Sequence, residues 1–204
     1  MDLKDDVKML LIGLVTFASA GALAALPVQS WTARSGAKVL FVESRSIPMI
    51  DVNIDFDAGA RYDSVEKAGL AALTQGLLGL GAGNLSEQEI ADAFADAGAQ
   101  RGGRLDRDRA GVSLRTLSSS TERESALATL TTLLAAPRFD DTVLAREKAR
   151  RIAALKEDET KPEVIADRAF DTALYGDHPY GRNPSIATID AITRADLQSF
   201  HAAH

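Results

Sequence analysis

Cysteine is absent from this chain of 204 residues, and histidine occurs only three times. The absence of cysteine excludes a disulfide framework and any metal site built from thiolates. Basic residues are also in deficit, because 23 Lys and Arg stand against 29 Asp and Glu, which gives a formal net charge of −6. That charge argues against nucleic-acid binding, which requires a basic surface. The length is sufficient for one or two domains with a buried core.

The beginning of the chain has the plan of a secretory signal peptide. Lysines precede an apolar run over residues 9–17, and small residues follow it, with Ala-x-Ala cleavage patterns at residues 18–20 and 22–24. The pattern predicts a signal peptide over residues 1–24 and a mature domain over residues 25–204, located in the periplasm or outside the cell. A retained membrane anchor is the alternative, because the apolar run is close to the shortest length that spans a bilayer.

Strands are predicted directly after this leader. Residues 28–32 and 38–43 flank a turn at Ser35-Gly36, which indicates a hairpin. Residues 50–57 alternate strictly between apolar and polar side chains, a period of two that predicts a half-buried strand. The polar positions of this strand are Asp51, Asn53, Asp55 and Asp57. They are interpreted as the solvated face of a sheet and not as a calcium site, because calcium loops place their ligands at a different spacing.

The stretch around which the chain is organised is an apolar helix predicted over residues 69–80. It has almost no polar face, which is typical of a buried helix. A glycine-rich loop over residues 79–84 follows. Ser86 with Glu89 then forms a capping box that opens a second helix. Gly98 is placed to end that helix.

Further strands and helices complete the pattern. Strands are predicted over residues 101–109 and 112–116, and the charge run at the end of the first is interpreted as a solvated hairpin tip. Helices are predicted over residues 122–134, from Asp140 or Asp141 onward, over residues 162–175 and after Thr193, with Thr121–Glu124 and Thr193–Asp196 as capping pairs. These elements indicate an α+β fold, with a mixed, largely antiparallel sheet and helices packed on one face.

Two separated motifs resemble those of one family. Residues 67–80 are similar to the signature helix of the insulinase/pitrilysin-type metallopeptidases, the inverted zincins, and the His-Pro-Tyr-Gly turn at residues 178–181 matches a second family motif. The resemblance covers about residues 28–204 and implies the half-barrel, metallopeptidase-like N-terminal domain of that family. A family domain continues beyond a helix such as the one that holds Phe200. The chain is therefore expected to be incomplete at its C-terminus, with an uncovered sheet edge and poor solubility alone.

In active family members the signature helix carries His-x-x-Glu-His. The two histidines lie about one turn apart and bind zinc, and the Glu polarises a zinc-bound water. The matching positions in this chain are Ala72, Gln75 and Gly76. The third family ligand, a Glu on a later helix, matches Ala154, seven residues after Glu147. Ala and Gly cannot bind a metal and Gln cannot act as a general base, so the resemblance implies no catalytic and no metal-binding residue in this chain.

The resemblance implies a catalytically inactive homologue of an exported zinc metallopeptidase. Such a chain acts as the non-catalytic subunit of a heterodimer, in which an active partner of the same family holds the zinc and the two chains enclose and process a peptide. In active relatives the strand comparable to residues 50–57 pairs with the substrate main chain. Two other interpretations stay open: an active zinc metalloendopeptidase with a non-standard site, and a non-enzymatic binding or assembly protein of the cell envelope.

The remaining candidate ligands are interpreted as structural. His178 is expected to be a turn residue, as it is in the family. His201 and His204 stand three residues apart without a carboxylate, which is weak support for a metal site. Glu147 is interpreted as a surface charge near two arginines. Glu157 lies three residues past the matched ligand position, off by most of a turn, and cannot replace that ligand.

Overall fold

The computed structural model describes residues 27–204. The chain divides into two compact units between Ile47 and Pro48. The predicted signal peptide, residues 1–24, lies outside the described residues. Within residues 27–204, no helix combines the length and the apolar composition needed to cross a membrane.

The described part of the first unit is a hairpin. Strand β1 (Val28–Thr32) pairs antiparallel with β2 (Lys38–Val42). Gly36 lies in the connecting turn with φ of +88°, a left-handed conformation that glycine adopts without steric cost. The hairpin predicted around Ser35-Gly36 is therefore confirmed. Several of its apolar side chains are exposed, among them Trp31 and Phe41.

A three-stranded antiparallel sheet forms the base of the second unit. Its strands lie in the order β3 (Met49–Phe56), β5 (Ala110–Leu117) and β4 (Gln100–Leu105). The apolar residues of β3 are half-buried on one face and its polar residues are exposed on the other. The alternation predicted for this strand is confirmed, because successive side chains of a strand point to opposite faces of the sheet.

The polar face of the sheet carries cross-strand ion pairs. Arg115 lies directly opposite Asp51 in the register, and its Nε and Nη2 donate to the two carboxylate oxygens at 2.6 and 3.0 Å. Arg104 reaches across to Asp55 at 3.0 Å. The hydrogen bond from Arg115 lowers the pKa of Asp51. The predicted solvated sheet face is therefore confirmed, and the structure adds that arginines neutralise Asp51 and Asp55.

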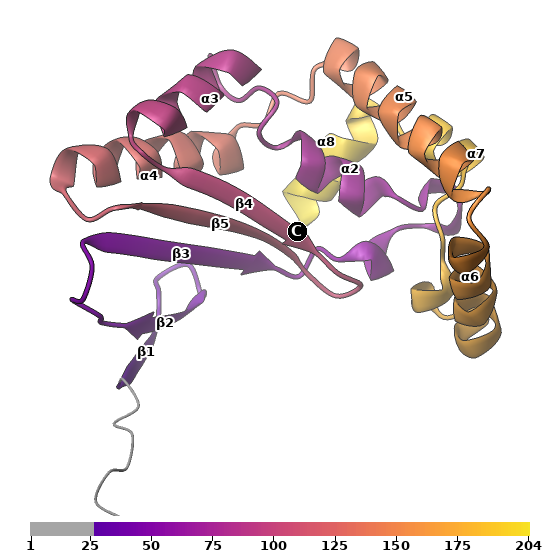
Figure 1. The fold of residues 1–204 in the computed structure, drawn as a ribbon, viewed down its shortest axis with the longest axis horizontal. Coiled ribbons are helices and arrows are strands. Elements are labelled where there is room, and N and C mark those ends of the chain that lie inside the picture. The colour runs from indigo at the N-terminus through magenta and orange to yellow at the C-terminus, as the bar shows by residue number, and fades with distance from the viewer. Residues whose placement is uncertain (1–26) are drawn as a thin grey trace, which may run out of the picture. The chain divides into compact units, whose positions relative to one another are not determined.

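Helices cover the other face of this sheet. The second unit contains α2 (Leu70–Leu77), α3 (Glu87–Asp96), α4 (Ser120–Ala135), α5 (Asp141–Asp158), α6 (Pro162–Tyr175), α7 (Ile186–Ala191) and α8 (Arg194–Ala203), with short 3₁₀ turns at Ala60–Tyr62, Val65–Lys67 and Pro179–Gly181. Figure 1 shows α3 and α4 side by side over the sheet. Helix α2 packs against α8, and α5 packs against α7.

The core lies between the sheet and these helices. Its most completely buried large apolar side chains, each with 2% of its surface exposed or less, are Leu77, Leu114, Leu133, Leu155, Ile189, Ile192 and Leu197. Burial of such a side chain contributes about 1.5–3 kcal/mol. The α+β fold with helices on one face of a sheet is thus confirmed, and every strand pairing among the described residues is antiparallel.

Several of the predicted helix ends are confirmed and two are wrong. Helix α2 ends at Leu77, three residues before the predicted end at residue 80. Ser86 with Glu89 and Thr193 with Asp196 form reciprocal capping boxes at the starts of α3 and α8. Helix α4 begins at Ser120 with Ser119 as its N-cap, two residues before the predicted cap at Thr121. The same Ser/Thr-x-x-Glu spacing occurs twice in this segment. The hydroxyl of Ser119 donates to the Glu122 carboxylate in the first of the two frames.

The N-terminus of α2 is capped by the side chain of Asp63, which lies six residues before the N-cap position. Gly69 occupies the N-cap position with φ of +103° and has no side chain to offer. Asp63, with only 3% of its surface exposed, supplies the missing acceptors: its Oδ2 accepts from Gly69 N at 2.7 Å and its Oδ1 from Ala71 N at 2.8 Å. Two main-chain donors that a helix N-terminus leaves without partners are thereby satisfied.

Replacement of Asp63 by Asn is expected to destabilise the fold by about 1–2 kcal/mol, because the amide must turn its NH2 donor toward one of the two main-chain N–H groups, whereas both oxygens of a carboxyl, protonated or not, can accept. Burial raises the pKa of Asp63, although main-chain hydrogen bonds oppose that rise. A raised folded-state pKa means that the stability linked to this carboxyl is complete below its unfolded pKa and declines as the pH rises through the folded value. Urea unfolding of the unaltered protein and of the Asp63→Asn variant should be measured at several pH values from acid to neutral. The difference between their free energies of unfolding should narrow as the pH rises. A difference that widens would contradict this sign.

Candidate functional site

The signature helix α2 has two different sides. Leu73 and Leu77 are buried in the core, whereas Ala72 is half-buried and Gly76 is exposed. A Cβ added at Gly76 would meet no atom within 4 Å. The expectation of a helix buried nearly all round therefore holds only for the side that faces the core. The positions matched to the two family histidines lie on the open side.

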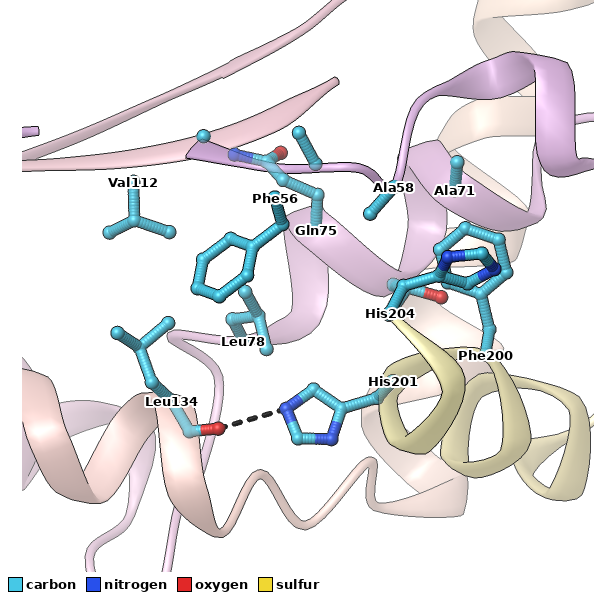
Figure 2. Close-up of a pocket in the computed structure, with 13 residues that line it drawn as sticks. Phe56, Ala58, Ala71, Gln75, Leu78, Val112, Leu134, Phe200, His201 and His204 are labelled. Atoms are coloured by element: carbon cyan, nitrogen blue, oxygen red, sulfur yellow. Dashed lines mark hydrogen bonds between the residues drawn. The ribbon is translucent and has the colours of Figure 1, made fainter. Parts of the chain in front are cut away.

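Gln75, matched to the family's catalytic Glu, lies on the side of α2 that faces the sheet. It borders a cavity of about 110 Å³ enclosed by α2, the sheet and α8. Figure 2 shows Gln75 of α2 and Leu78, just after α2, facing this cavity together with Phe56, with Phe200 on α8 and His204 at the end of α8. No acidic side chain lines the cavity. It is a mostly apolar space, and the ionisable groups on its lining are the imidazoles of His201 and His204.

The histidines are engaged with the main chain. His201 Nε2 lies 2.9 Å from the Leu134 carbonyl oxygen, and His204 Nδ1 lies 2.8 Å from the Asp57 carbonyl oxygen. A carbonyl only accepts, so each of these ring nitrogens donates a proton. The two rings fasten the end of the chain to the ends of α4 and β3. Across residues 27–204, no group of three His, Asp or Glu side chains is arranged to hold a metal ion.

His178 has the structural role predicted for it. It precedes the 3₁₀ turn Pro179–Gly181, and its Nδ1 accepts from the main-chain N–H of Tyr180 at 3.3 Å. The rings of His178 and Tyr180 meet edge to face with centroids 4.7 Å apart. This turn is held by a tyrosine that reaches beyond it, because the Tyr180 hydroxyl donates to Asp108 Oδ1 at 2.5 Å. That hydrogen bond raises the pKa of Tyr180.

The charge run between β4 and β5 has more contacts than a solvated hairpin tip would have. Asp106 Oδ1 accepts from the main-chain N–H groups of Asp108 and Arg109, both at 2.8 Å, which turns the chain and ends β4 at Leu105. Arg107 then pairs with Asp171 of α6 at 2.7 Å. The prediction of a simple solvated tip is therefore wrong. Sequence spacing could not predict the contacts of this hairpin with Asp171 and Tyr180, because each of these residues lies more than 60 positions from its partner in the hairpin.

The residues at the family's metal positions do not fit zinc. Ala72 and Gly76 have no donor atom, and Gln75 is a weak substitute for a carboxylate. Ala154 is half-buried on α5, a helix that contacts α2. Glu147 is engaged with Arg146 at 2.9 Å and with Arg150 at 3.1 Å, which confirms that it is paired with arginines, although its side chain is only 16% exposed and is not the free surface charge that the sequence predicts. The residues at these four matched positions therefore supply no zinc-binding set.

Similar proteins were found by sequence and by structure. Residues 38–185 match the family described as insulinase, peptidase family M16. An uncharacterized zinc protease of Mycobacterium leprae is 27% identical over 173 residues, which cover 83% of this chain and 38% of that protein. This chain therefore spans well under half of that relative's length.

Solved structures show the same fold. The crystal structure of a peptidase M16 inactive domain from Pseudomonas fluorescens superposes with a TM-score of 0.84 at 37% identity, over 87% of this chain and 43% of that one. The periplasmic protease PqqL of Escherichia coli superposes with a TM-score of 0.74 at 14% identity, over 88% of this chain and 21% of that one. At that low identity the second likeness concerns the fold alone.

Proposed function

This chain belongs to the insulinase family, peptidase family M16, and we propose that it acts there as a non-catalytic homologue that pairs with an active zinc peptidase. The observation that carries this proposal is the chemistry of the α2 surface. Ala72, Gln75, Gly76 and, on α5, Ala154 are the residues assigned to the ligand and base positions. None of them provides a histidine nitrogen or a carboxylate.

The framework around these positions supports a retained structural use. Asp63 caps α2, capping boxes begin α3 and α8, and the His-Pro-Tyr-Gly turn is fastened to the β4–β5 hairpin. A domain that keeps this framework without metal ligands is suited to forming one wall of a chamber around a peptide. The relative from Pseudomonas fluorescens, which is 37% identical, is itself described as an inactive domain.

In this proposal the zinc belongs to the catalytic partner, a chain of the same family, and the substrate is a peptide. The present chain contributes surface that binds and positions the substrate. We further propose that the pair works in the periplasm or outside the cell, on the basis of the signal peptide predicted over residues 1–24.

The test is a pull-down of the full-length protein from its native cell, with zinc analysis and a peptide-cleavage assay on the eluate. Zinc and activity are expected to travel with a second chain that carries His-x-x-Glu-His, and to disappear when that chain is removed. Zinc and cleavage retained by this chain alone would contradict the proposal in favour of a non-standard active site. Recovery of envelope proteins without any peptidase chain would contradict it in favour of a binding or assembly role.

A further inference from the structure

Two polar side chains bridge α2 and β4, and each of them lies on a glycine. A Cβ at Gly103 of β4 would overlap Gln75 Nε2 of α2. A Cβ at Gly79, just after α2, would overlap Arg101 Nη2 and lie 2.7 Å from Arg101 Cζ. In the first contact a side chain from α2 lies on a glycine of β4, and in the second a side chain from β4 lies on a glycine just after α2. This arrangement is possible because residues 75 and 79 lie on one side of the helix and residues 101 and 103 on one face of the strand. The glycines leave room that the amide and the guanidinium occupy.

The Arg101 guanidinium has no counter-charge among the described residues. Arg115 and Arg146 have carboxylate partners whose hydrogen bonds raise the pKa of each guanidinium. The pKa of Arg101 is lowered instead, and the cause is burial alone. Its guanidinium is shielded where it lies on Gly79, while the residue as a whole stays exposed. An anion that reached it would relieve this cost, because an opposite charge favours the charged form.

Arg101 is accessible from solvent. Strand β4 is the last strand of its sheet in the order β3-β5-β4, so Arg101 lies at an edge. Gly76 precedes Gly79 by three residues on the α2 side and has open space in front of it. The unpaired guanidinium therefore lies at a sheet edge, close to the open surface of α2, in a chain whose net charge is −6.

We infer that Arg101, at the sheet edge beside α2, binds a carboxylate of a peptide as its counter-charge. A guanidinium is planar and presents paired N–H groups that match the two oxygens of a carboxylate. The carboxylate is either the C-terminus of the peptide or an Asp or Glu side chain. This inference deepens the proposed function, because the ligand is the class of substrate that the chamber would hold.

The experiment measures peptide binding to the purified full-length protein by calorimetry. The probes are a short N-acetylated peptide of uncharged residues with a free C-terminus, its C-terminal amide, and that amide with one central Glu. Loss of a charged hydrogen-bonding group is expected to weaken binding about tenfold or more. At least one of the two carboxylate peptides should therefore bind about tenfold more tightly than the uncharged amide, and the one that does identifies the source.

Variants assign the preference to this site. Arg101→Gln should abolish the difference between the carboxylate peptide and the amide. Gly79→Ala should reduce it with the charge retained, because the new Cβ displaces the end of a flexible side chain. Arg151→Gln, which removes an exposed charge on α5, is the matched control and should leave the difference unchanged.

Equal affinity for all three peptides, no binding of any of them, or a preference that survives Arg101→Gln would overturn the inference. Because binding is measured without a partner chain, failure here leaves the pull-down result standing. Conversely, a carboxylate site can be present in a chain that recruits no peptidase.

Discussion

The variant with Ala72→His, Gln75→Glu, Gly76→His and Ala154→Glu is expected to bind zinc at micromolar affinity or tighter, which corresponds to a standard binding free energy of about −8 kcal/mol or more negative. Residues 72 and 76 lie on the open side of α2, one turn apart, so their imidazoles share a face. A Cβ added at position 76 would meet no atom within 4 Å. Because α5 contacts α2, a Glu at position 154 is available as the third ligand.

Zinc content after dialysis, measured by elemental analysis on protein whose folding is verified by circular dichroism, decides this prediction. The control variant keeps Ala72→His, Gln75→Glu and Ala154→Glu but leaves Gly76 unchanged. It should retain much less zinc, since one of three ligands is missing. A folded quadruple variant without zinc would show that the four positions are assigned to the wrong register. That outcome would also remove the main support for the proposed function.

Local patterns in the sequence were sufficient for most elements of the fold. The strict alternation of residues 50–57 predicted β3, because a single buried face imposes a period of two. Ser86 with Glu89 predicted the start of α3, because both capping hydrogen bonds are made within one turn. In each case the residues that cause the structure are neighbours in the sequence.

Features that join distant segments could not be predicted in the same way. Asp63 caps α2 from six residues before Gly69, outside any N-cap pattern. The Tyr180–Asp108 hydrogen bond and the contact of Arg101 with Gly79 join segments whose sequence gives no periodic signal. The degenerate metal positions were assigned by resemblance, and the structure adds that Gly76 faces open space. The sequence also could not predict that the Arg101 guanidinium lies on Gly79 without a carboxylate partner in the described part of the chain, because that depends on how β4 packs beside α2.

Replacement of Gly59 by Ala is expected to destabilise the fold by about 3 kcal/mol or more. Gly59 has φ of −79° and ψ of 175°, which any residue adopts, so the cause is lack of space. A Cβ there would overlap Asp108 C and Arg109 N and lie 2.5 Å from Arg107 O, all of them main-chain atoms that cannot rotate away.

The displaced hairpin would also lose hydrogen bonds. The main-chain N–H groups of Gly59, Ala60 and Arg61 donate to carbonyl oxygens of the β4–β5 turn at 3.1, 3.1 and 2.8 Å. Each such bond contributes about 0.5–1.5 kcal/mol. The same turn holds Tyr180 and, through Arg107, α6, so the strain is transmitted to the His-Pro-Tyr-Gly turn.

Gly76→Ala is the matched control for Gly59→Ala, because it adds the same methyl group in a helix with open space around it. Removal of a helical glycine should raise the stability by about 0.5–1 kcal/mol. Thermal unfolding of the two variants should therefore give melting temperatures that move in opposite directions, by roughly 2–4 °C for each kcal/mol. Similar small shifts for both would mean that the β4–β5 turn yields to a methyl group, and that the junction between Gly59 and the hairpin is not a rigid part of the fold.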